Sequence, residues 1–367
     1  MIDYVEARNL NFEVIGILDT SQSVIWHSVY YGVGDFQIFI SLHDAMNVIA
    51  DARYITRPDN DEVGVIESVL IADDIENGKM MTIKGRFAKS LLDRRIIFNL
   101  SGTSNKATIL QGNVENAVRS LVNDNAIVSR SLGVLELGAV ARIGKIIVDE
   151  SGAAAQKQVS FENLLEYTEE MLKEYGIAST VKLHNSKLQY SVYEGADRSA
   201  DNTDGNQPIV FGKEFDNLIS SEFSHDSSLE KNVALIGGEG EGIDRFCVLL
   251  GSQNGLNRKE VFVDASSIAK KYKDENEIEQ TYTDAQYSAM LKAHGHQAMS
   301  DLKVLEDFNG AIDITNGNWK FGVDVFLGDI VTIQDNEIGV FKNVRLGEVT
   351  EYQDKDGYSI EVVYQGE

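Results

Sequence analysis

The stretch whose residues most suggest chemistry is "ALIGGEGEGIDRF", Ala234 to Phe246, where a short apolar run gives way to alternating glycine and glutamate. A glycine loop after a strand can bind phosphate through its backbone N–H groups. This loop has neither the G-x-G-x-x-G spacing of a dinucleotide site nor the Lys-Ser/Thr of a P-loop. Glu239 and Glu241 would also repel an anion. We therefore expect a solvated connection between two strands, whose glycines adopt unusual backbone angles.

Other patterns that could hold a metal or a nucleophile also fail on spacing. "DKDG" from Asp354 resembles part of a calcium loop, but Val363 occupies the place of the bidentate glutamate. "DNTDG" from Asp201 lacks the same carboxylate, so both stretches are predicted as turns. His294 and His296 stand two apart on a predicted helix and therefore face nearly opposite sides. The sequence predicts no catalytic residue, no cofactor-binding residue, no metal ligand and no cofactor.

Composition narrows the classes of partner. The chain has 367 residues, a net charge of −25 and one cysteine, Cys247. So acidic a chain is poorly suited to hold nucleic acid or an anionic membrane, although it suits a surface past which nucleic acid slides. The first ten residues do not resemble a signal peptide, and no apolar run is long enough to span a bilayer. We expect a soluble protein of a reducing compartment, without stable membrane insertion.

The elements that would position any site alternate between strand-rich and helical blocks. Residues 1–100 show period-two patterns, including "SVIWHSVYY" and a hairpin with an Asn-Gly turn inside "ADDIENG". In 101–206 the period moves toward 3.6. Asn113 is expected to cap a helix with Val114, Ala117, Val118, Leu121 and Val122 on one face. Ser160 is expected to begin a second helix that ends at Gly176, with an apolar stripe of Phe161, Leu164, Leu165, Thr168, Met171, Leu172 and Tyr175.

The second half repeats this alternation. Strand patterns return after Pro208, and a third helix begins at Thr283, where Gln286 completes a capping box. Its expected stripe is Tyr287, Met290, Leu291, His294, Ala298 and Leu302. The chain then closes with another strand-rich block that contains an Asp356-Gly357 turn.

Two hairpins in these strand blocks resemble each other. Gly64–Gly85 and Arg345–Gly366 each contain a strand with Glu before Ser or Val, an acidic loop, an Asn/Asp-Gly turn and an alternating strand that ends in Gly. Two hairpins can resemble each other by chance. The alternative is a β domain duplicated within the chain, with one copy at each end.

Four segments, in order over nearly the whole chain, resemble the bacteriophage tail hub family, the tail-tip or baseplate-hub proteins of siphophage and related contractile tails. The first carries Trp26, Tyr31-Gly32 and Gly34-x-Phe36. The second carries Gly85, Arg86, Leu91 and Arg94-Arg95. The others are "VYEGADRS" with "IVFGKEFDNLISSEF", and "KNVALIGGEGEGIDR" with "GLNRKEVFVDASSI".

The resemblance implies an α+β, mostly β fold, with two tube-type β-barrel domains and smaller α+β inserted domains that form a ring. Adding the strand blocks, we expect a first barrel at 1–100, an inserted α+β domain at 101–206, a discontinuous second barrel at 207–240 and 306–367, and an inserted strand-helix domain at 241–305. Trp26, Phe36 and Val65 are expected in the core, and Arg86, Arg94 and Arg95 in buried or interfacial ion pairs.

The function implied is non-enzymatic: a homotrimeric adaptor at the virion tail tip, or in a phage-like particle, assembled in the bacterial cytoplasm. Its partners would be the tail tube or distal tail ring protein, a spike or tail fibre protein and the tape-measure protein, without specific nucleic acid binding. The chain ends just after the last strand block, so no appended hydrolase is expected. The alternative is a tail-associated peptidoglycan hydrolase. A carbohydrate-binding β protein is disfavoured because Trp26 and Trp319 lie in different blocks.

Overall fold

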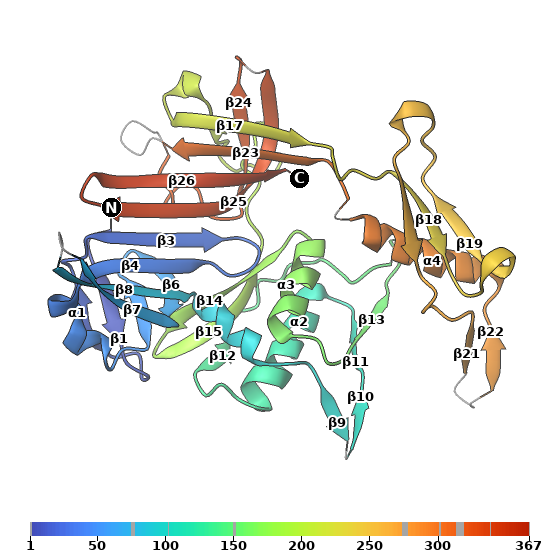
Figure 1. Ribbon diagram of the computed structural model, residues 1–367, viewed down its shortest axis with the longest axis horizontal. Coiled ribbons are helices and arrows are strands. Elements are labelled where there is room, and N and C mark those ends of the chain that lie inside the picture. The colour runs from blue at the N-terminus through green and yellow to red at the C-terminus, as the bar shows by residue number, and fades with distance from the viewer. Residues whose placement is uncertain are drawn as a thin grey trace. The chain divides into compact units, whose positions relative to one another are not determined.

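The structure is a computed structural model (Figure 1). It describes residues 2–74, 78–101, 103–149, 152–273, 278–300, 302–312, 319–337 and 339–366. The chain divides into two compact units, which are described separately below. The first contains Met1–Val148, Ala154–Glu222 and Asp307–Glu367, and the second contains Asp149–Ala153 and Phe223–Glu306. Among the described helices, none is long and apolar enough to cross a bilayer.

The first strand block folds as two sheets around a shared core. In β3 and β4, inward side chains such as Trp26, Phe36 and Ile38 alternate with half-exposed ones, as a sheet with one buried face requires. Trp26, Phe36 and Val65 are all buried, which confirms their expected core positions. The elements of this block are β1 (Val5–Arg8), β2 (Val14–Leu18), β3 (Ser23–Val29), β4 (Asp35–Ser41), α1 (Leu42–Ile49), β5 (Tyr54–Arg57), β6 (Asn60–Val65), β7 (Ser68–Asp74), β8 (Gly78–Arg86) and the 3-10 turn Ala88–Arg94.

The last strand block has its own core, formed by side chains that include Phe211, Leu346 and Tyr364. Its elements are β16 (Val210–Phe211), the 3-10 turn Lys213–Phe215, β17 (Leu218–Asp226), β23 (Leu305–Ile312), β24 (Ile330–Asp335), β25 (Val340–Asp354) and β26 (Gly357–Gly366). β25 and β26 form the hairpin predicted around Asp356-Gly357. β7 and β8 form the other predicted hairpin, whose Asn77 lies outside the described residues.

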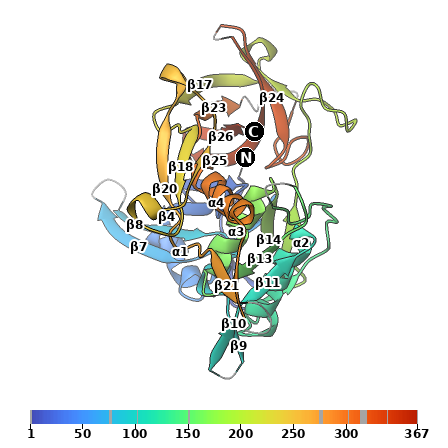
Figure 2. The ribbon, with the colours of Figure 1, turned by 90° about the vertical axis from the view of Figure 1, so that its right-hand side faces the viewer.

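One long, ten-stranded sheet joins the two blocks, with eight of its strands in the row β17-β23-β26-β25-β3-β4-β8-β7 (Figure 1). The other two, β16 and β24, lie off this row, where β24 pairs with β25 and β16. Counting only the four row strands of each half, the arrangement is the same: β26 lies between β23 and β25, as β8 lies between β4 and β7. The halves meet where β25 pairs antiparallel with β3. In Figure 2, β17 and β7 lie at opposite ends of the sheet. The resemblance between the two hairpins therefore extends to four strands in each half.

The region 101–206 shares a sheet and a core with the first strand block. Within the seven-stranded sheet, β14 pairs with β6 through Lys182 and Glu62. The structure thus shows no break in packing near residue 100, although the four-domain division itself stays a prediction. The elements are β9 (Asn99–Ser101), β10 (Ser104–Lys106), β11 (Thr108–Gln111), α2 (Val114–Val122), a π-helical turn (Asn123–Val128), β12 (Leu135–Leu137), β13 (Gln156–Val159), α3 (Leu164–Glu174), β14 (Ala178–His184) and β15 (Lys187–Tyr193).

The two helix starts predicted in this region have different outcomes. Asn113 caps α2, accepting a hydrogen bond from the backbone N–H of Asn116, as predicted. The start predicted at Ser160 is wrong, because Asn163 caps α3 by accepting from the backbone N–H groups of Leu165 and Glu166. Phe161 precedes this cap at φ +66° and is 62% exposed, so it is not part of the apolar stripe.

The second unit packs α4 (Asp284–Met299) against a three-stranded sheet of β19, β18 and β20. The capping box of Thr283 and Gln286 is present, as predicted. The predicted stripe is partly wrong, because Ala298 is exposed and Gly295 is buried instead. A Cβ on Gly295 would lie 2.5 Å from Ile236, so the glycine allows the close packing of helix on sheet. The remaining elements are β18 (Val233–Gly237), the 3-10 turn Gly242–Asp244, β19 (Cys247–Leu250), the 3-10 turn Gly255–Asn257, β20 (Glu260–Asp264), β21 (Lys271–Lys273) and β22 (Glu279–Thr281).

The second unit also contains residues that the sequence analysis placed in the second barrel. The range 207–240 was expected there, yet β18 pairs with β19 and β20. β18 pairs with strands that follow it closely in the chain, and the local pattern of an apolar run does not show which sheet it joins.

Candidate functional site

The glycine loop is a hairpin connection, as predicted. It joins β18 to the antiparallel β19, and a Cβ on Gly240, at φ +103°, would lie 2.6 Å from the carbonyl oxygen of Asp244. Its first backbone N–H groups are occupied, since Gly238 donates to the carbonyl of Phe246 at 2.8 Å and Glu239 to the hydroxyl of Tyr287 at 2.7 Å. These groups therefore hold the loop in place and do not point at an anion.

The other sequence patterns lie apart from one another. In the described part of the chain, no group of three or more His, Cys, Asp or Glu side chains could hold a metal ion. Asp354 accepts from the backbone N–H of Asp356 in the β25–β26 turn, as predicted for a turn residue. Asp201 accepts from the side chain of Asn343 at 2.7 Å, at a turn before β16. His294 is half-buried on α4 and His296 is exposed.

The three arginines of the second motif have different environments. Arg86 pairs with Glu67 at 2.9 Å and with Asp93 at 3.2 Å, as expected of an ion-pair residue. Arg95 instead donates to the backbone carbonyl of Arg130 at 2.8 Å, and Arg94 is exposed. Arg86 therefore forms ion pairs, but its side chain is 41% exposed and not buried as expected. Arg94 is exposed as well, and Arg95 satisfies its guanidinium through backbone oxygen.

The line where the two halves of the long sheet meet carries a buried ion pair. We call this line the seam, and it is the antiparallel pairing of β3 with β25. On the face toward the cores, the Arg57 guanidinium donates to both oxygens of Glu351, at 2.8 and 3.0 Å, and to both oxygens of Asp59. It also lies over the Trp26 ring, 5.3 Å from its centroid.

Several groups compensate for the burial of this pair. Burial alone would lower the pKa of Arg57, but its hydrogen bonds with Asp59 and Glu351 outweigh burial and raise it. Tyr358 donates its hydroxyl to Glu351 at 2.5 Å. Burial, reinforced by the negative charge of Glu351, raises the pKa of Tyr358 well above its ordinary value. Both oxygens of Glu351 and all three nitrogens of the Arg57 guanidinium thus have hydrogen-bond partners, as a buried ion pair needs.

The opposite face of the seam carries a second polar contact. His27 on β3 lies between two carboxylates, with Nε2 3.0 Å from Glu348 on β25 and Nδ1 3.3 Å from Asp35 on β4. Polar side chains from both halves thus meet on each face of the seam.

The two outer edges of the long sheet contrast with the seam. Within the described residues, no strand pairs with the outer edge of β7 or of β17. β7 exposes three consecutive apolar side chains, Val69, Leu70 and Ile71. An unpaired strand with apolar side chains on both faces is suited to pair with another chain.

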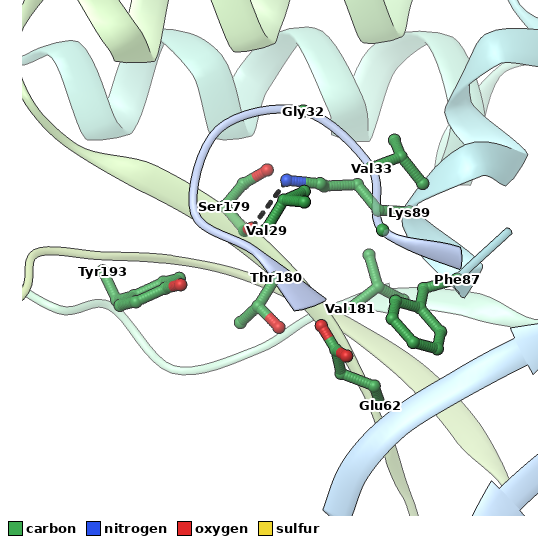
Figure 3. A pocket seen from close by; sticks show the side chains of 11 residues that line it. Val29, Gly32, Val33, Glu62, Phe87, Lys89, Ser179, Thr180, Val181 and Tyr193 are labelled. Carbon is green, nitrogen blue, oxygen red and sulfur yellow. Dashed lines mark hydrogen bonds between the residues drawn. The ribbon is translucent and has the colours of Figure 1, made fainter. Parts of the chain in front are cut away.

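A polar recess lies where the region 101–206 packs on the first strand block (Figure 3). Lys89 donates to Glu169 at 2.8 Å and to the carbonyl of Ser179 at 3.0 Å, which ties the first block to α3 and β14. Glu62 reaches the recess from another side and accepts from Ser28 at 2.6 Å, while burial raises its pKa to about 7.

Most of the residues that form these contacts were missed in the sequence. Arg57, Glu351 and Glu169 stand in no motif. Lys89 lies within the second motif but was not singled out, and the two members of each pair are far apart in the chain. The one available signal was the similarity of the two hairpins. Glu351 lies three residues before the turn-flanking Asp354, where the other hairpin has the apolar Ile71 before Asp74.

Comparisons with known proteins are consistent across most of the chain. The family model of the Siphovirus ReqiPepy6 Gp37-like protein matches residues 4–364. The structure is similar to that of the tail protein from Neisseria meningitidis MC58, with a TM-score of 0.60 at 12% identity over 99% of this chain and 96% of that chain. No significant match is found among curated protein sequences.

Two prophage structures share the fold as well. The 43 kDa tail protein of prophage MuSo2 from Shewanella oneidensis has a TM-score of 0.57 at 9% identity, over 99% of this chain and 98% of that chain. Prophage tail protein gp18 from Listeria monocytogenes EGD-e has a TM-score of 0.51 at 11% identity, over 99% and 94%. At such low identity these similarities establish the fold, which is that of phage tail proteins.

Proposed function

The chain belongs to the siphovirus ReqiPepy6 Gp37-like family, and from that premise we propose that it is a non-enzymatic hub of a phage or phage-like tail. It sits at the distal end of the tail tube, forms a ring of three copies and lines the channel. Its two tube-type halves match the six-fold tube, and its inserted regions meet a three-fold spike or fibre. The observation that carries this proposal is the repeated strand order of the long sheet.

The repeat supplies an argument for pairing between chains. Among the four row strands of each half, β25 and β7 come third in chain order, and β3 and β17 come first. Within the chain, a third strand pairs with a first strand at the seam. By the same rule the free β7 pairs with the free β17 of a second copy.

Burial at equivalent positions supports this rule. Counted from the aspartate that flanks each turn, Val69 and Ile71 on β7 correspond to Val349 and Glu351 on β25. At the seam, Val349 is 1% and Glu351 is 5% exposed. On the free edge, Val69 is 43% and Ile71 is 54% exposed. The positions that are exposed on the free edge of β7 are thus the positions that are buried on β25, where β3 pairs with it.

Such an interface is head-to-tail, so it must either close into a ring or continue as a filament. Three chains with two halves each would give a ring of six similar domains, which fits a six-fold tube. Closure would also remove both sheet edges, which otherwise promote aggregation.

The channel would be lined by the face of the long sheet that points away from the cores. By strand register this face carries the carboxylates Asp35, Glu348 and Glu361, together with the cations Lys84 and Arg86. In a chain of net charge −25, we propose that Asp and Glu dominate this lining, so that a polyanion passes without adhering. A ring whose lumen is mainly Lys and Arg would refute this part of the proposal.

The ring is tested by Ile71→Lys, which places charge on the proposed contact while leaving the isolated chain intact, because Ile71 is more than half exposed. Light scattering of the native protein should give the mass of three chains, and the variant should give that of one chain with an unchanged melting temperature. Ile17→Lys is the matched control, since Ile17 is 53% exposed on β2 of the other sheet. A trimer that survives Ile71→Lys would contradict the proposed pairing.

A further inference from the structure

The seam and the free edges of the long sheet present a problem of partner choice. β25 and β7 have the same place in their halves and end in turns at equivalent positions. Both could pair with β3, whose backbone ladder does not distinguish them. Each chain therefore needs a side-chain feature that admits β25 beside β3 and rejects β7 of another copy.

Arg57 supplies that feature through its position. It extends from β5 over Trp26, and Trp26 stands directly opposite Glu351 in the register of β3 with β25. Were β7 to pair with β3 in the same register, Ile71 would occupy the place of Glu351. The guanidinium, whose side chain is 1% exposed, would then keep Asp59 but lose both hydrogen bonds to Glu351.

Such a loss is costly because a buried charge without its partner is far less stable than either a complete pair or an apolar replacement. Buried polar pairs set register and partner in other assemblies by the same physics. We propose that the Arg57–Glu351 pair is the partner-selecting contact of the long sheet: it restricts β3 to β25 and leaves β7 for β17 of another copy. This inference rests on the proposed ring in assigning β7 to a second chain.

The decisive variant makes the two candidate strands alike. Arg57→Met with Glu351→Leu replaces the pair by apolar side chains of similar size, a change that leaves many folds stable. β25 then carries an apolar residue where β7 carries Ile71. Pairing of β7 with β3 therefore no longer leaves a buried charge without its partner. We expect the double variant to fold but to lose partner choice.

Disulfide trapping measures that choice directly. Ile25 on β3 stands opposite Tyr352 on β25, and Ala72 is the equivalent of Tyr352 on β7. In a Cys247→Ser background, one chain carries Ile25→Cys and another carries Ala72→Cys, and the two are refolded together and oxidised. The native pair should give little covalent dimer, and the double variant a several-fold larger yield. Equal yields would overturn the proposal.

Two controls keep the result interpretable. Ile25→Cys with Tyr352→Cys in a single chain should form an internal disulfide in both backgrounds, which reports that the seam has folded. If the double variant fails this control, Glu351→Gln replaces it, because this change removes the charge at nearly constant shape. If the yield of covalent dimer with Glu351→Gln were no higher than with the native pair, the proposal would be overturned. A native protein that scatters as something other than a trimer would count against the ring, not against partner choice, because the trapping compares only strand pairs.

Discussion

At the seam and at the free edge of β7, strands with the same place in their halves have different surroundings. At the seam, the third strand of one half is covered and carries a buried carboxylate that meets Arg57. On the free edge, the equivalent strand is exposed and carries isoleucine at that place. The difference teaches that two halves with the same strand order need not present the same kind of surface at equivalent strands. The internal contact tolerates a buried charge, because its partner is always on the same chain, whereas a contact between chains benefits from apolar side chains that desolvate easily.

The largest expected effect tests the charged side of this comparison. Arg57→Ala leaves Glu351 buried without its main partner, so we expect the free energy of unfolding to fall by about 3–5 kcal/mol. Urea denaturation followed by circular dichroism measures it. Arg86→Ala is the matched control, because Arg86 is 41% exposed in its pairs and should lose less than about 1 kcal/mol. Equal losses in the two variants would mean that the seam has no special role.

The next effect concerns Glu62, at the contact between β6 and β14. Its pKa of about 7 in the folded protein lies above its ordinary 4.5, so the folded state binds more protons and stability falls as pH rises from about 4.5 to 7. Glu62→Gln should therefore raise the free energy of unfolding by about 1–3 kcal/mol at pH 8 and change it little at pH 4. Denaturation at the two pH values checks the difference. A gain that is the same at both would contradict the protonation argument.

Glu62 also offers the sharpest test against the hydrolase alternative, since a raised carboxyl pKa in a recess is a feature of general acids. We expect no clearing of peptidoglycan by the purified native protein in zymography. A cleared band that disappears in Glu62→Gln would overturn the non-enzymatic proposal. Glu351→Gln is the comparison variant for zymography, because it changes a buried carboxylate of the seam.

The smallest expected effect is a null shift in ligand screening. ATP, NAD, calcium and zinc should leave the melting temperature unchanged, because the N–H groups at the start of the glycine loop are occupied and the histidine pair does not converge. Differential scanning fluorimetry over a range of ligand concentrations measures this. A saturable rise with any of the four would show a site that the spacing argument missed.

The sequence revealed features that depend on neighbouring residues better than features that depend on strand pairing. The cap at Asn113 and the capping box at Thr283 were predictable, because they depend on residues three apart. The start of α3 was not, since Ser160 and Asn163 are both good caps and Phe161 extends the apolar pattern outward.

Placement of the strands depended on distant partners. The two hairpins were found from their turns and alternation, yet the sheet that joins them was not. β18 has the pattern of any apolar strand, and this pattern does not show that it pairs with the nearby β19 and β20 and not with the long sheet. Arg57 stands beside Pro58 and Asp59, which look like a turn, so its burial against a residue 294 positions away had no local signature.

The covalent link between the two halves has a consequence for assembly kinetics. In the proposed ring, every second contact between neighbouring halves forms inside one chain, at an effective concentration set by the tether and not by the amount of protein in the cell. Those contacts incur no loss of translational and rotational freedom on association, and only the alternate ones depend on encounters between molecules. A tip present in very few copies per particle can then assemble at protein concentrations at which six separate subunits would stay apart.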